Sequence, residues 1–191
     1  MPKLIEPKYI SPDMTDDTEL DAESTARSSA DTTLQNQINL KQDLPKTYLI
    51  TAIQSTSSVT HSDITEFVSE SLPVGTYKVR AMGKVLSSST TNGFGLRVQN
   101  GTAIISNYVI DCELEQGASG TTQDFIYKQV AANVNITSAS VPSTTVPTVF
   151  EVDGFITISS AGTVKMQFRS ELNTQSVAIQ VGSVFTLEKV A

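Results

Sequence analysis

The sequence of 191 residues is poor in the side chains that carry most enzyme chemistry. It has one cysteine, Cys112, and one histidine, His61, so no disulfide can form within the chain and the two cannot ligate zinc by themselves. A nucleophilic thiol needs a base, and no signature spacing links Cys112 to His61. We therefore expect Cys112 to be a small buried apolar residue, and we expect no enzyme, no metal site and no cofactor.

Signals for phosphate binding and for membrane insertion are also missing from the sequence. Residues 93–95 (GFG) lack the third glycine and the following helix of a phosphate-binding loop. No window approaches the run of about 18 apolar residues that a membrane helix needs. The first residues contain no apolar signal core. We expect a protein that is made in a cytoplasm and has no membrane partner.

Charge is scarce and mostly negative. Charged residues make up 17% of the chain, and the formal net charge is −7. A negative protein is repelled by the phosphate backbone, and we find no cluster of Lys and Arg that would offset this. We expect no nucleic-acid partner.

Residues 1–15 are predicted to form an extended anchoring arm. Prolines at positions 2, 7 and 12 forbid a continuous helix and favour extended chain. Between them lie the apolar residues that we expect to dock on a partner surface: Leu4, Ile5, Tyr9 and Ile10. The alternative is a disordered tail.

Residues 16–44 are predicted to form a helical stalk. Acidic residues at its start favour the positive end of a helix dipole, and Pro45 stops the helix. A helix this polar cannot bury enough apolar surface alone to be stable in water. Copies of the chain could bundle it as a short, partly polar coiled coil. The residues predicted to form its seam are Leu20, Ala26, Ala30, Leu34 and Ile38.

From residue 45 onward, apolar and polar residues alternate as they do in β-strands. Tyr77, Val79 and Ala81, for example, alternate with Lys78, Arg80 and Met82, and Gly, Asn, Ser and Pro clusters separate many such runs. We predict roughly eight to ten strands. Residues 45–191 are therefore expected to form an antiparallel β-sandwich or jelly roll, so that the chain is mainly β.

Some of these strands are apolar on both faces. The segments 103–105 and 108–110 are examples, and the run around Phe155 comes close. An apolar outer face is a liability in a lone sandwich but becomes an interface against copies of the chain. The alternative is that a loop covers each strand. Asp111, Glu113 and Glu115 alternate on one strand, and we expect them to be its solvated side.

Two stretches resemble a known family. Residues 30–43 (ADTTLQNQINLKQD) resemble helical linkers of tailed-bacteriophage fibre proteins. Residues 150–156 (FEVDGFI) and 161–170 (AGTVKMQFRS) are similar to the last strands of phage knob domains, which resemble the trimeric heads of tumour necrosis factor relatives. The resemblance implies a homotrimer with a virion-anchored N-terminal peptide, a short coiled coil and a distal β knob.

These observations favour a structural virion protein, either a trimeric head fibre or a capsid decoration protein. It would attach through residues 1–15 to the major capsid protein or a baseplate protein, and it would reside in the virion. The alternative is a receptor-binding tail fibre or adhesin that recognises a host surface glycan or protein. The chain is short and has no repeated shaft, which favours the head fibre or decoration protein.

Overall fold

The structure of the protein is a computed structural model that divides into two compact units, residues 1–43 and 44–191. The second unit is called the knob below. The predicted anchoring residues of the arm lie outside the described part of the chain. The structure describes residues 17–42, 44–116, 123–131, 134, 137–140 and 144–190.

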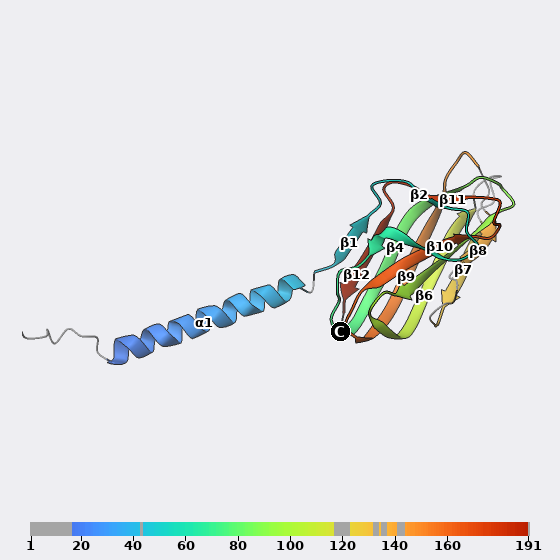
Figure 1. Cartoon of the computed structure of the whole chain (residues 1–191). Coiled ribbons are helices and arrows are strands. Elements are labelled where there is room, and N and C mark those ends of the chain that lie inside the picture. Colours follow the sequence, from blue (N-terminus) through green and yellow to red (C-terminus); the bar gives the residue numbers. More distant parts are fainter. Residues whose placement is uncertain are drawn as a thin grey trace, which may run out of the picture. The chain divides into compact units, whose positions relative to one another are not determined.

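The first unit contains one helix, α1, which covers Asp17–Gln42 (Figure 1). This is the helix that the sequence predicts. Neither Gly nor Pro interrupts the range, and Pro45 follows its end. Its 26 residues correspond to a length of about 39 Å. Every side chain described along it, from residue 21 to residue 38, is exposed.

The described part of the knob consists of β-strands and their connections. The strands are β1 Lys46–Leu49, β2 Gln54–Thr56, β3 Ser62–Val68, β4 Gly75–Ser87, β5 Gly93–Asn100, β6 Ile104–Gln116, β7 Gln123–Gln129, β8 Thr137–Ser140, β9 Thr148–Ser160, β10 Val164–Ser170, β11 Val177–Ile179 and β12 Val184–Lys189.

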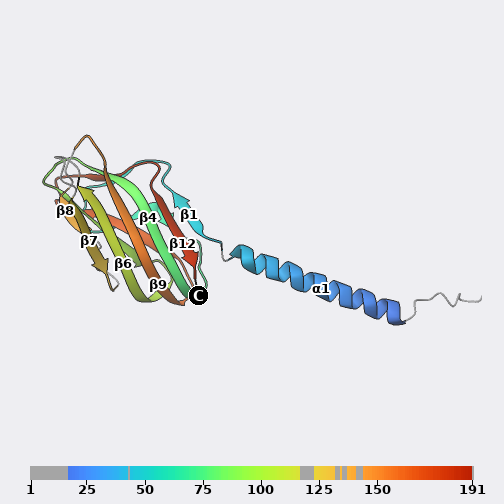
Figure 2. The same ribbon diagram turned by 180° about the vertical axis from the view of Figure 1, so that it is seen from behind.

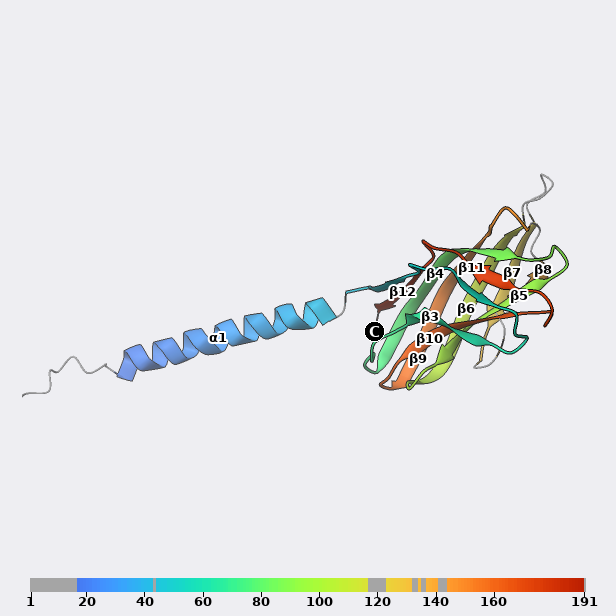
Figure 3. The same cartoon turned by 45° about the horizontal axis from the view of Figure 1, so that its top comes forward.

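The strands form two antiparallel sheets. The large sheet has the order β1-β12-β4-β9-β6-β7, and β11 joins both β4 and β2. Figures 1 and 2 show β1 and β12 at one edge of this sheet and β6 and β7 at the other. The small sheet has the order β3-β10-β5-β8, and Figure 3 shows it against the large sheet. The predicted β-sandwich is therefore present.

The core lies between the two sheets and follows the alternation of the sequence. On β4 the side chains of Tyr77, Val79 and Ala81 are buried, whereas Arg80 and Met82 on the same strand are exposed. Aromatic rings connect the sheets. The ring of Phe94 in β5 lies 5.8 Å from that of Phe150 in β9, centroid to centroid.

A glycine allows β6 and β9, two of the three longest strands of the large sheet, to pair closely. Gly154 in β9 is opposite Ile110 in β6. A Cβ atom at this position would overlap the carbonyl oxygen of Val109 and the Cα atom of Ile110. The register between β6 and β9 also shifts near Ile105 and Asn107. Glycine inside a strand is explained here by the approach of the neighbouring backbone.

The described residues contain twelve strands, more than the eight to ten that alternation predicts. The additional strands are short: β2 and β11 have three residues each, and β1 and β8 have four. A segment of three or four residues is too short to show a period of two, so its strand character comes from pairing with a distant segment.

Candidate functional site

The predicted helical seam lies on the exposed surface of α1. The side chains of Ala26 and Ala30 are exposed, as are Leu34 at 56% and Ile38 at 47%. These four residues follow one another at intervals of four, so they share one face of the helix. The side chain of the fifth predicted residue, Leu20, is outside the described side chains. The seam remains a prediction.

Local contacts stabilise α1 only weakly. Arg27 donates to the carboxylate of Glu23 at 2.6 Å, with both side chains largely exposed. Such a pair four residues apart contributes a few tenths of a kcal/mol. Thr25, Thr32 and Thr33 donate their hydroxyls to backbone carbonyls four residues earlier, which adds no contact beyond the helix.

The outer face of the large sheet carries exposed apolar side chains, as the sequence predicts. Ile104 and Val109 on β6 and Phe155 on β9 are all exposed, so no described loop covers them. Val109 is directly opposite Phe155, and Phe155 is opposite Lys78 on β4. The Lys78 ammonium lies 5.9 Å from the centre of the Phe155 ring, within the range of a cation–π contact.

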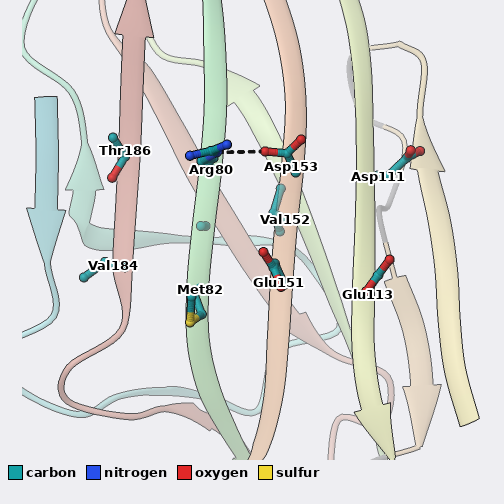
Figure 4. Close-up of a pocket in the computed structure, with 10 residues that line it drawn as sticks. Arg80, Met82, Asp111, Glu113, Glu151, Val152, Asp153, Val184 and Thr186 are labelled. Atoms are coloured by element: carbon teal, nitrogen blue, oxygen red, sulfur yellow. Dashed lines mark hydrogen bonds and ion pairs between the residues drawn. The ribbon is translucent and has the colours of Figure 1, made fainter. Parts of the chain in front are cut away.

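Four carboxylates gather beside these apolar residues (Figure 4). Asp111 is opposite Asp153 across β6 and β9, and Glu113 is opposite Glu151. Like charges directly opposite each other destabilise a sheet. Among ion pairs between described side chains, Asp153 is the one of the four that takes part, with Arg80 at 3.0 Å and with Lys78 at 3.5 Å.

These carboxylates, Arg80, Met82 and their neighbours line an open hollow of about 590 Å³. Among the described residues, no group of three or more acidic, His or Cys side chains is arranged to hold a metal ion. Asp111 and Glu113 are exposed, which agrees with their predicted place on the solvated side of the strand. The side chain of Glu115 is not among those described.

Cys112 is buried in the core, as predicted. Burial, with a smaller contribution from the charge of Glu113, raises the pKa of its thiol to about 12. A thiol with this pKa is almost fully protonated at neutral pH, and the thiolate is the nucleophilic form. Cys112 therefore has the chemistry of an inert core residue.

The tyrosines of the core are not available as a carbohydrate platform. Tyr77 and Tyr108 are buried, and Tyr48 packs its ring against Phe185 at 5.9 Å between centroids. Burial raises the pKa of Tyr108 to about 12, although the nearby charge of Arg97 opposes this shift. These rings stabilise the knob.

Glu66 has a role that its sequence context does not reveal. Its carboxylate accepts hydrogen bonds from the hydroxyl and the backbone N–H of Thr51 and from the side-chain amide of Gln54. The hydrogen bond from the Thr51 hydroxyl is the main reason that the pKa of Glu66 is lowered. The residue thus fastens β3 to the connection that follows β1, which holds this edge of the knob in place.

Comparison with known proteins gives no family for the chain. No family model matches it, and no curated protein matches it. Among solved structures, VP2 of the infectious bursal disease virus subviral particle aligns with 78% of this chain at 13% identity, with a TM-score of 0.18. The aligned part is 41% of that chain. A TM-score this low supports neither a shared fold nor a shared function. Within the described part of the chain, no helix has the length and apolar character needed to span a membrane.

Proposed function

We propose that this chain is a structural protein of a bacteriophage virion, a homotrimeric head fibre or capsid decoration protein. Three copies bundle α1 into a short coiled coil, and residues 1–15 attach the trimer to the major capsid protein or to a baseplate protein. The observation that carries the proposal is the exposure of all described side chains along α1. Its mechanism is binding, in which three arms add avidity at a symmetric site.

The energetics of α1 support association. Intrinsic propensity alone gives an isolated helix little stability in water, and most helices in proteins are stabilised by packing of one face. α1 has few apolar residues, yet Leu34 and Ile38 lie next to each other on one face and are both about half exposed. A narrow apolar stripe of this kind is what a coiled coil covers.

The topology of the knob supports the same class of protein. The order β1-β12-β4-β9 faces the order β3-β10-β5-β8, and the chain passes repeatedly between the two sheets. We interpret these eight strands as the two Greek keys of a jelly roll, with the hairpin β6–β7 added beyond β9. The knob would then be similar to the trimeric heads that phage fibres carry.

The mass of the purified protein tests the trimer. Three chains of 20.5 kDa give about 61 kDa, which light scattering coupled to size exclusion measures directly. We expect this mass at micromolar concentration. A mass near 20.5 kDa under the same conditions would contradict the proposal.

Removal of residues 1–15 tests the anchor. The shortened protein is expected to keep the trimer mass and to lose its binding to virus particles assembled without it, as measured by co-sedimentation. The full chain added to the same particles serves as the control. If the shortened protein binds the particles as well as the full chain does, the arm is not the anchor.

A further inference from the structure

We propose that the knobs of neighbouring copies meet along the edge formed by β1, with Leu49, Val184 and Met82 as the contact row. The occupant of this surface is a second copy of the same chain. The inference rests on the proposed trimer and goes further, because it assigns one edge of the knob to the interface.

The contact row runs across three strands on the outer face of the large sheet. Leu49 in β1 is directly opposite Val184 in β12, and Val184 is opposite Met82 in β4. Leu49 is 51% exposed and Met82 is 53% exposed. Figure 4 shows Val184 and Met82 side by side on this face. Three apolar side chains therefore line up beside the outermost strand, and two of them are about half exposed to water.

A hollow next to the contact row can receive a side chain from another copy. It has a volume of about 220 Å³ and is lined by residues of β4, β9 and the turn before β12, including Met82, Val149, Val181 and Val184. Val181 is exposed at its rim. The lining is mainly apolar, so an apolar side chain is the group that gains most by entering it.

The edge itself is built for side-chain contact and not for the addition of another strand. β1 pairs with β12 on one side and has no strand on the other among the described residues. It is only four residues long, it follows Pro45, and Lys46 forms an ion pair with Glu70 at 2.9 Å. Short length, proline and lysine are features that prevent open-ended pairing of edge strands. Neighbouring copies are therefore expected to contact each other through the side chains of Leu44 and the contact row.

The short connection between α1 and β1 limits how far β1 can lie from the end of the helix. Only residues 43–45 lie between the end of α1 and the start of β1. The span from Gln42 to Lys46 is at most about 14 Å. In a coiled coil the helix axes lie about 8–10 Å apart. In the proposed trimer the start of β1 therefore lies within about 14 Å of the end of its own helix, whereas β7 is removed from β1 by five strand spacings, or about 24 Å.

The acidic part of the same face is a poor alternative contact. Glu113 and Glu151 are opposite each other, as are Asp111 and Asp153. If this patch lay nearest the three-fold axis, the carboxylates of the three copies would lie close together, which costs free energy. The contact row carries no charge of its own and lies at the β1 side of this patch, where Met82 is directly opposite Glu151.

Distances between spin labels in the full chain test the inference. Ile53 follows β1 and Val130 follows β7, and both side chains are exposed, so Ile53→Cys and Val130→Cys place labels at opposite edges of one sheet. The buried Cys112 is expected to take no label, which the unsubstituted chain checks. We expect the distance between copies to be shorter at residue 53 than at residue 130 by about 15 Å or more.

The outcomes separate this inference from the trimer itself. A particle of trimer mass with residue 130 as close between copies as residue 53, or closer, overturns the β1 interface and leaves the trimer intact. A particle of monomer mass overturns the proposed function and this inference with it.

A pair of substitutions gives a second, independent measurement. Leu49→Glu is expected to raise the concentration at which the trimer dissociates by about tenfold or more, because it places a carboxylate at the contact row. Val130→Glu is the matched control and is expected to change the dissociation concentration of the trimer by less than about twofold. Both positions are exposed, so neither change disturbs the core, and circular dichroism checks the fold. Equal effects of the two substitutions would overturn the inference.

Discussion

Phe185→Ala is expected to lower the free energy of unfolding of the knob by about 3–5 kcal/mol. Phe185 lies in β12 and is fully buried. Its ring is 5.9 Å from the ring of Tyr48 in β1 and 5.6 Å from that of Phe67 in β3, so it connects the edge of the large sheet to the small sheet. Removing the ring leaves a cavity between β1, β3 and β12, and we expect these paired strands not to move enough to fill it.

Urea denaturation followed by tyrosine fluorescence measures this loss. Val74→Ala is the control, because Val74 is exposed, lies outside the proposed contact between copies, and its truncation is expected to change stability by no more than about 0.5 kcal/mol. Phe185→Leu keeps part of the volume and is expected to lose less than Phe185→Ala. All variants are compared at one protein concentration, since association stabilises the folded chain. A loss below about 1 kcal/mol for Phe185→Ala would mean that the two sheets do not depend on this ring.

Alternation predicts the long strands because one face of each is buried. Val164, Met166 and Phe168 of β10 are buried as the sequence indicates, and so are Phe150 and Val152 of β9. Pro45 also predicts the end of α1, since a proline restricts the residue before it. In each case the physical cause acts within a few residues, so the sequence is sufficient.

The pairing of strands could not be predicted in the same way. Arg80 and Asp153 form an ion pair although 73 positions separate them, and this pair exists only because β4 and β9 are neighbours in the large sheet. The contact row has the same origin, since Leu49 and Val184 become neighbours only when β1 pairs with β12. Short strands such as β2 and β11 depend on each other for the same reason.

The sequence predicts some features of the candidate site and not others. The sequence indicates that residues around Val109 and Phe155 are apolar on both faces, and the structure confirms their exposure. It does not indicate that Asp111 and Glu113 each lie opposite another carboxylate, because register is a property of two strands. The predicted anchoring arm lies outside the described residues, and the deletion of residues 1–15 tests its role.

The joint substitution Leu34→Ser and Ile38→Ser is expected to convert the trimer into monomers at micromolar concentration. Burying one such side chain contributes about 1.5 kcal/mol, so the six side chains of a trimer contribute about 9 kcal/mol. Little else among the described side chains of α1 offsets this loss, because they are exposed and the ion pair between Arg27 and Glu23 is on the surface. Once separated, the helix is too polar to persist, and its circular dichroism signal is expected to fall as well.

Thr32→Ser together with Asn36→Ser is the matched control. These residues have the same spacing of four but lie on the opposite face of α1, and Thr32 donates to Ser28 in a bond that serine can also make. The control is expected to keep the trimer mass and the helical signal. If the first pair of substitutions also keeps both, the apolar stripe is not a seam, and the reason for assigning three chains to one particle is lost. If both pairs of substitutions dissociate the particle, the loss is not specific to the face of Leu34 and Ile38, and the assignment of the seam to this stripe is overturned.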